Sequence, residues 1–130
     1  MRGQVMAKLY LMLAALFGAS GVALGALGAH GLRGKVTESL LEAYKTGVQY
    51  QMLHALTLLG VALLIQNWGG RLSLTLSGAF FVFGMIFFSG SLYALALGGP
   101  RWLGPVTPIG GTLMIAGWIT LLFAAVNYSK

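Results

Sequence analysis

The chain has 130 residues, of which 58% are hydrophobic and only 8% are charged, whereas about a quarter of the residues in soluble domains are charged. Its formal charge of +6 comes from eight Lys and Arg against two acidic residues, and these charges are scattered rather than gathered on one basic face. The composition therefore excludes an ordinary soluble domain, argues against nucleic acid as a partner, and favours one integral membrane domain in contact with anionic lipid headgroups.

The first predicted membrane-spanning helix covers residues 9–29. Its 21 residues give about 31 Å at about 1.5 Å per residue, which matches a hydrocarbon core of about 30 Å. Arg2 and Lys8 precede this apolar run, as basic residues do in a secretory signal. Because the run is longer than the apolar part of a signal, we expect it to remain as a span.

Four glycines of the first span recur at steps of three, four and three residues: Gly18, Gly21, Gly25 and Gly28. This spacing confines them to one stripe of a helix, roughly 80° wide. Helices in lipid associate through close packing of small residues. We therefore expect the stripe to form a groove that receives a neighbouring helix.

The second predicted span covers residues 48–65, where Gln49, Gln51 and His54 interrupt the apolar run. Such polar residues predict a helix that faces protein for part of its length. The helix itself is expected to begin earlier, because Ser39 and Glu42 have the spacing of a capping box and Thr37 is an alternative cap. Its opening turns would therefore lie at the headgroup level before the helix enters the bilayer.

The third and fourth spans are predicted at residues 72–97 and 108–128. The third would be about 39 Å long, enough to tilt or to protrude. Thr107 followed by Pro108 predicts the start of the fourth helix, since threonine accepts from first-turn amides and proline lacks an N–H there. Each helix carries its own stripe of small residues: Ser73, Ser77, Gly84 and Ser91 on the third, and Gly110, Gly117 and Ala124 on the fourth.

The expected fold is all-α: one integral membrane four-helix bundle over residues 1–130, with up-down topology, short loops and an interfacial start to the second helix. Basic residues are balanced across the membrane, with Arg2, Lys8, Arg71 and Lys130 facing Arg33, Lys35, Lys45 and Arg101. The first helix usually dominates orientation, so its preceding basic residues favour cytoplasmic termini, with dual insertion as the alternative.

Polar residues of the spans map to one side of this topology. The candidate polar cluster consists of His30, Tyr50, Gln51, His54, Ser89, Ser91, Tyr93 and Thr107. An ionisable residue within a span is a functional candidate, because an unpaired one costs several kcal/mol in hydrocarbon. His54 is therefore either a neutral ring that holds the bundle together or a group that handles a ligand or a proton. For His30 we expect contact with the last carbonyls of the first helix.

The sequence lacks the residues that catalysis and metal binding need. It contains no Cys and no Asp, and both Glu lie at the start of the second helix. Two histidines without a carboxylate or thiol make a poor haem or metal site. GALGAHGL, residues 25–32, also lacks the lysine of a phosphate-binding loop. We expect neither an enzyme nor a bound metal or cofactor.

Four segments together resemble a known family: GALGAHGL at 25–32, GVQYQMLHAL at 47–56, FFSGSLYALAL at 87–97 and VTPIGGTLMIAGW at 106–118. They are similar to the YgdD and YwdK-like small bacterial membrane proteins, a domain of unknown function. The resemblance implies a four-helix protein of the bacterial inner membrane. It implies no activity, substrate or cofactor.

Two functions from different classes fit these features. The first is a structural or interaction protein, either a self-associating bundle or an accessory subunit of a larger membrane complex, because packing faces are many and reactive groups few. The second is a small channel or transporter that works as a dimer and uses the polar cluster. The expected partners are membrane lipid and either a second copy or a larger membrane complex.

Overall fold

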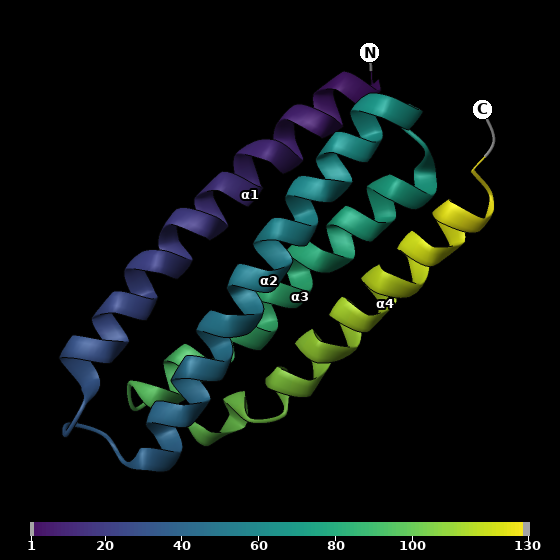
Figure 1. Cartoon of the computed structure of the whole chain (residues 1–130). Coiled ribbons are helices and arrows are strands. Elements are labelled where there is room, and N and C mark those ends of the chain that lie inside the picture. Colours follow the sequence, from purple (N-terminus) through teal and green to yellow (C-terminus); the bar gives the residue numbers. More distant parts are fainter. Residues whose placement is uncertain (1, 129–130) are drawn as a thin grey trace.

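The computed structural model describes residues 2–128, apart from the side chain of Ala29, and consists of four long helices joined by short connections (Figure 1). They are α1 (Arg2–Leu27), α2 (Glu38–Trp68), α3 (Leu72–Ala96) and α4 (Val106–Val126), with a π-helical turn η1 (Gly28–Leu32) after α1 and a 3₁₀ turn η2 (Arg101–Leu103) before α4. The described residues form no strand, and each of the four helices is long and apolar enough to cross a membrane. The predicted all-α membrane fold is therefore confirmed. Lys130, one of the basic residues assigned to the side of the chain ends, lies outside the described residues.

Successive helices run in opposite directions. One end of the molecule holds both described chain ends and the α2–α3 turn, and we call it the terminal end; the loop end holds the α1–α2 and α3–α4 connections (Figure 1). Each helix packs mainly on its neighbours in the chain, so α1 and α4 are the outer helices (Figure 1). Within the described chain the backbones of α1 and α4 do not approach one another, and α4 lies against α3.

The second helix starts well before its predicted span of 48–65, at Glu38, as the capping signal at Thr37 indicated. Its 31 residues correspond to about 46 Å, which exceeds a hydrocarbon core of about 30 Å. The cap is Thr37, whose hydroxyl accepts from the Leu40 amide at 3.2 Å. The predicted Ser39 capping box is wrong, because Ser39 already belongs to the helix and Thr37 satisfies the first-turn amide.

The predicted start of α4 is also wrong in detail. The helix begins at Val106, so Thr107 lies in its first turn rather than before it. Pro108 is tolerated there because first-turn amides have no partner within the helix. The Thr107 hydroxyl is left to bond with Ser91 of α3.

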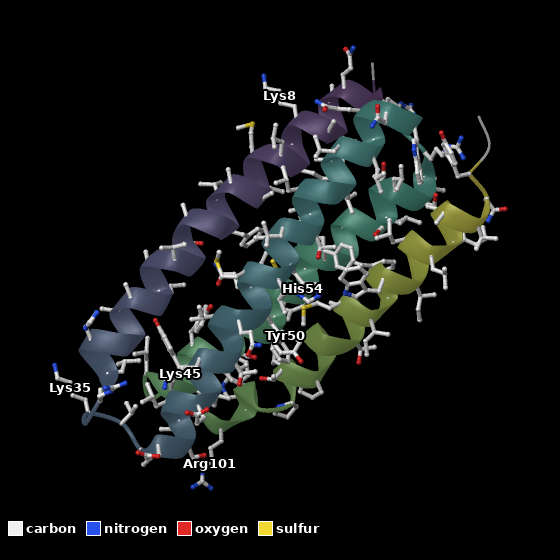
Figure 2. The ribbon with its side chains drawn as sticks, in the orientation of Figure 1. Lys8, Lys35, Lys45, Tyr50, His54 and Arg101 are labelled. Carbon is white, nitrogen blue, oxygen red and sulfur yellow. The ribbon has the colours of Figure 1, made fainter. Side chains whose placement is uncertain are left out.

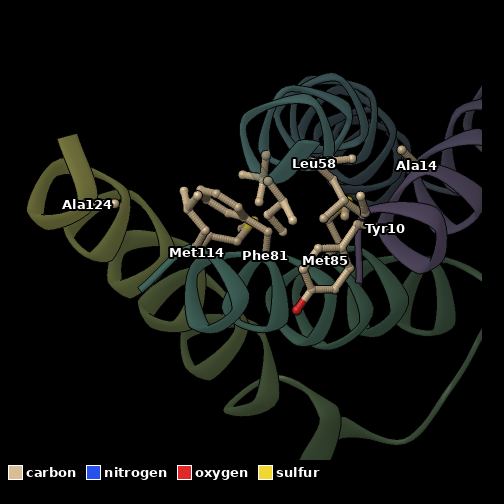
Figure 3. Packing of buried hydrophobic residues seen from close by; sticks show 12 residues of the cluster. Tyr10, Ala14, Leu58, Phe81, Met85, Met114 and Ala124 are labelled. Carbon is tan, nitrogen blue, oxygen red and sulfur yellow. The ribbon is translucent and has the colours of Figure 1, made fainter. Parts of the chain in front are cut away.

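Apolar side chains fill the space between the helices. Leu58 of α2 and Phe81 of α3 are completely buried, and they meet Met85 and Met114 at the centre of the cluster in Figure 3. Tyr10 closes the cluster from α1: its ring lies against Gly78 and its hydroxyl donates to the carbonyl of Thr75. The interior is a packed core in which the polar groups must find protein partners.

Three of the four glycines predicted for the α1 groove lie against α2. A Cβ on Gly25 would stand 3.3 Å from the Val48 side chain, and one on Gly21 or Gly28 would overlap the side chains of Met52 or Tyr44. The assignment of Gly18 to this groove is wrong, because no atom of another helix lies within 4 Å of its Cβ position. It lines a small groove that remains open between α1 and α2.

The closest approach of two helices joins α3 and α4. A Cβ on Gly110 would lie 2.7 Å from the Phe88 Cα, and one on Gly84 would lie 2.9 Å from the Met114 nitrogen. Further along, Gly117 makes room for the ring of Phe81. Backbones this close leave space for no side chain at either glycine.

Candidate functional site

The candidate polar residues lie on η1, α2, α3 and α4, but they do not form one cluster. Gln51 and Tyr93 belong to a network between α1, α2 and α3, whereas His54 and Tyr50 face α4. The serines and Thr107 form separate contacts of α3 with its neighbours. His54 also lies near the middle of α2 rather than at the loop end, as Figure 2 shows, because α2 begins so early.

Gln51 ties three helices together through its amide group. The side chain is 5% exposed, and its Nε2 donates to the Phe17 carbonyl at 2.8 Å and to the Ser20 hydroxyl at 2.9 Å. Its Oε1 accepts from the Tyr93 hydroxyl at 2.7 Å. Both donor hydrogens and one acceptor site of the amide are thus used. Gln51 is an interhelical bridge from α2 to α1 and α3.

The ring of Tyr93 reaches Gln51 because α2 carries a glycine beneath it. A Cβ on Gly47 would lie 2.8 Å from the Tyr93 ring. Tyr44 packs beside Tyr93 at 5.0 Å between ring centroids, and its hydroxyl donates to the carbonyl of Leu24 in α1. The two tyrosines therefore extend the same network towards the loop end.

His54 has a hydrogen-bond partner at each ring nitrogen. The Trp118 indole N–H of α4 donates to Nε2 at 3.1 Å, and Nδ1 lies 2.8 Å from the Tyr50 carbonyl. An indole nitrogen only donates and a carbonyl only accepts. His54 must therefore be neutral, with its proton on Nδ1. In an imidazolium the Nε2 hydrogen would meet the indole hydrogen.

Tyr50 lies one turn before His54, on the side of α2 that faces α4 (Figure 2). Its ring stacks on His54 with 10° between the planes and lies 4.9 Å from the Phe88 ring centroid. The side chain is 39% exposed, and its hydroxyl makes no hydrogen bond to the residues that the structure describes. Tyr50 thus presents a phenol at the open flank between α2 and α4.

Hydroxyl groups of α3 bond to the backbones of both neighbouring helices. Ser89 donates to the Gly47 carbonyl of α2 at 2.7 Å, and Ser77 donates to the Gly117 carbonyl of α4 at 2.9 Å. Ser91 donates to the Phe88 carbonyl at 2.9 Å and pairs with Thr107. These short side chains allow close helix contact and provide a hydrogen bond at the same place.

His30 contacts none of these groups of candidate residues. It lies in η1, its ring is exposed, and it makes no hydrogen bond to the described part of the chain. The expectation that it would contact the last carbonyls of the helix is wrong, because η1 continues the helix to Leu32 and directs the ring outward.

Trp118 and Ser20 were not among the predicted site residues. Trp118 donates a hydrogen bond to His54, and Ser20 accepts one from Gln51. The sequence did carry a signal for Trp118. An indole N–H within a span needs an acceptor, and a histidine on another span is a suitable one. Nothing comparable marks Ser20, since serines are common in spans and often bond to their own helix, as Ser20 also does to the Phe17 carbonyl.

Across residues 2–128, every buried side-chain nitrogen or oxygen has a hydrogen-bond partner. The same residues bring no three His, Cys, Asp or Glu side chains close enough to hold a metal ion together. The buried polar side chains Gln51, His54, Ser77, Ser89 and Ser91 therefore all bond to another helix, whereas the Tyr50 hydroxyl makes no hydrogen bond to a described residue.

The comparison with known families agrees with this architecture. The sequence profile of the family described as "Protein of unknown function (DUF423)" matches residues 24–111, from the end of α1 to the start of α4. This chain belongs to the DUF423 family. The matched range holds all eight candidate polar residues.

Proteins with similar sequences come from several bacteria. The chain is 44% identical to the UPF0382 membrane protein YwdK of Bacillus subtilis over 121 residues, covering 93% of this chain and 98% of YwdK. It is 38% identical to the UPF0382 inner membrane protein YgdD of Escherichia coli over 125 residues, covering 95% of this chain and 93% of YgdD. No solved structure matches. The DUF423 chain is a multi-pass protein of the bacterial cytoplasmic membrane.

Proposed function

We propose that this DUF423 protein is a structural membrane protein that acts by lateral association with a second copy or with a larger membrane complex. The observation that carries the proposal is the use of its polar side chains. Gln51, His54 and the serines of α3 are consumed by contacts between helices. The surface that remains for contact with lipid or with another protein consists mainly of the outward faces of the helices.

The outer face of α1 supports association. Ala15, Ala19 and Val22 are exposed, and Gly18 lies among them with no other helix within 4 Å of its Cβ position. Small residues four apart on an exposed face allow another helix to approach closely in lipid. Beside them, a groove of about 160 Å³ between α1 and α2 is lined in part by Gly18 and Leu56.

We propose a non-enzymatic role, and the residue types of the chain support it. The chain contains no Asp and no Cys. Glu38 and Glu42 are exposed at the loop end, where Glu42 pairs with Lys45 at 3.8 Å. His54 has both ring nitrogens engaged, so within the described residues neither a carboxylate nor this imidazole is left to act as a buried acid or base.

The association can be measured on the full chain in lipid nanodiscs or mild detergent. We expect cross-linking and native mass spectrometry of native membranes to recover the protein in an assembly larger than one chain. Gly18→Leu should reduce that assembly, because the side chain would fill the open groove beside α1, where a Cβ meets no atom within 4 Å. The matched control is Gly60→Leu, since Gly60 of α2 also has no other helix within 4 Å. Recovery of free monomer alone from wild-type membranes would contradict the proposal.

A dimeric channel or transporter is the second candidate, and Tyr50 is the observation in its favour. Its unbonded hydroxyl and the His54 ring face the flank between α2 and α4, where a second copy would be needed to complete a pathway. If this function is correct, reconstituted vesicles should show a flux that His54→Ala reduces. A flux that persists in His54→Ala would remove the residue from any pathway.

A further inference from the structure

A cavity of about 480 Å³ opens at the terminal end between α1 and α3. Its lining combines the first turns of α1 with the α2–α3 turn and the first turn of α3: Arg2, Val5, Met6, Gly70, Leu72 and Thr75. Its size lies within the range of ordinary small-molecule sites, about 300–1,000 Å³.

Two close contacts between the helices frame the cavity. At the very end, Gly3 of α1 packs on Gly70, where a Cβ on either residue would come within 3 Å of the other's backbone. Deeper in the membrane, Tyr10 packs on Gly78 and bonds to the carbonyl of Thr75. Between these contacts α1 and α3 diverge, and Val5 and Leu72 remain 63% and 73% exposed. The opening therefore faces the lipid.

The cavity carries a cation at its outer end and apolar side chains below. The headgroup level at this end is marked by Trp68 and Tyr128, whose rings stack at 4.1 Å between centroids. Gly70 follows Trp68 by two residues, so Arg2 beside it lies at the same level. A phospholipid has the same order of groups, with a phosphate at the interface and acyl chains beneath.

The charge around the cavity favours an anionic lipid. The terminal end carries Arg2, Lys8 and Arg71 among the described residues, and both Glu of the sequence lie at the loop end. Arg71 is engaged at the chain end, donating to the Asn127 carbonyl at 3.3 Å and lying over the Tyr128 ring. Arg2 makes no ion pair with a described residue, so its guanidinium is available to a phosphate.

We propose that this cavity binds one anionic phospholipid, with the phosphate on Arg2 and an acyl chain between Val5 and Leu72. The site is separate from the eight candidate polar residues and does not depend on lateral association of the protein.

The test is native mass spectrometry of the full chain, titrated in detergent with phosphatidylglycerol or phosphatidylcholine. The wild-type chain should retain one phosphatidylglycerol in preference to phosphatidylcholine. Arg2→Gln should lower that preference about fivefold, the factor that one basic residue at a lipid surface contributes. Lys8→Gln is the matched control, because Lys8 lies at the same end of α1 (Figure 2) but does not line the cavity.

A second pair of variants tests the acyl-chain part of the site. Val5→Trp should fill the cavity and reduce retention of both lipids, whereas Leu16→Trp, at an equally exposed position of α1 outside the cavity, should not. Equal effects of Arg2→Gln and Lys8→Gln would overturn the proposal in favour of a diffuse surface field. Unchanged retention in Val5→Trp, or displacement of the lipid by inorganic phosphate, would overturn it as well.

Discussion

His54 illustrates how an ionisable residue is made compatible with a bilayer. Trp118 supplies a donor to Nε2 and the Tyr50 carbonyl accepts from Nδ1, so the neutral ring has no unmet hydrogen bond. Phe81 packs against the ring at 5.6 Å between centroids. The residue thereby joins α2 to α4, two helices whose backbones do not meet in the described chain.

This geometry predicts one tautomer of His54. We expect ¹⁵N NMR of the protein in nanodiscs at neutral pH to find the proton on Nδ1 and a bare Nε2. Trp118→Phe removes the indole donor and should lower the free energy of unfolding by about 1 kcal/mol, because Nε2 is left buried without a partner. Trp102→Phe is the control, since Trp102 is 68% exposed. A protonated ring, or a proton on Nε2 in the wild-type chain, would disprove the assignment.

Replacing Gln51 tests how much its interhelical hydrogen bonds contribute to stability, with Gln49 of the same helix as the control. Gln51→Leu conserves volume but removes three hydrogen bonds and leaves the Tyr93 hydroxyl without its acceptor. We expect the free energy of unfolding in detergent to fall by about 2 kcal/mol. Gln49→Leu changes an exposed residue of the same helix and should have little effect. Equal stability of the two variants would mean that the network contributes nothing measurable.

At the scale of elements, the glycines divide into those that meet another helix and those that do not. Gly84 and Gly110 allow the backbones of α3 and α4 to touch, whereas Gly18, Gly60 and Gly90 have no other helix within 4 Å. In the first group a side chain would force two helices apart. In the second a Cβ atom would meet no neighbouring helix.

Alanine substitution should separate the two groups. Gly110→Ala places a methyl group against the backbone of Phe88, so we expect a loss of about 2 kcal/mol and a looser α3–α4 pair. Gly90→Ala on α3 should be neutral or stabilising by up to about 1 kcal/mol, because alanine favours a helix over glycine. Thermal unfolding of the two variants in the same detergent compares them directly. The packing argument fails if Gly110→Ala is as stable as wild type.

Sequence patterns predicted the number and direction of the helices because long apolar runs and short polar connections determine both. Periodicity also indicated that small residues would gather on stripes. It could not say which members of a stripe meet a neighbour: Gly21, Gly25 and Gly28 do, and Gly18 does not. A stripe about 80° wide is broader than one line of helix contact, so the crossing of α1 and α2 decides which residues are included.

At the scale of the whole molecule, the sequence did not predict which helices pack against one another. In water an apolar stripe reveals which face of a helix is buried, but in lipid both faces are apolar. Ile119 and Phe123, for example, are as apolar as the core yet more than 60% exposed on α4. Hence the order in which the helices pack side by side is seen only in the structure.

The orientation of the molecule in the membrane depends on how its basic residues divide between the two sides, and this division is even. Of its eight Lys and Arg, Arg2, Lys8 and Arg71 lie at the terminal end and four others at the loop end, while Lys130, outside the described residues, follows the fourth span in the sequence. Acidic residues have little influence on insertion, so the two Glu at the loop end do not break the tie. Arg2 and Lys8 precede the first span and favour cytoplasmic termini.

Labelling of single cysteines tests this balance, because the natural chain contains none. With cytoplasmic termini, an impermeant maleimide added to whole cells should label Trp102→Cys at the loop end and spare Asn67→Cys at the terminal end; both positions are exposed. Replacing Arg2 and Lys8 with Gln leaves two basic residues against four, so labelling should shift towards position 67. Replacing Glu38 and Glu42 with Gln is the control and should leave the pattern unchanged. If the double Arg2 and Lys8 variant is labelled like the wild type, packing between the helices and not charge determines which way the bundle inserts.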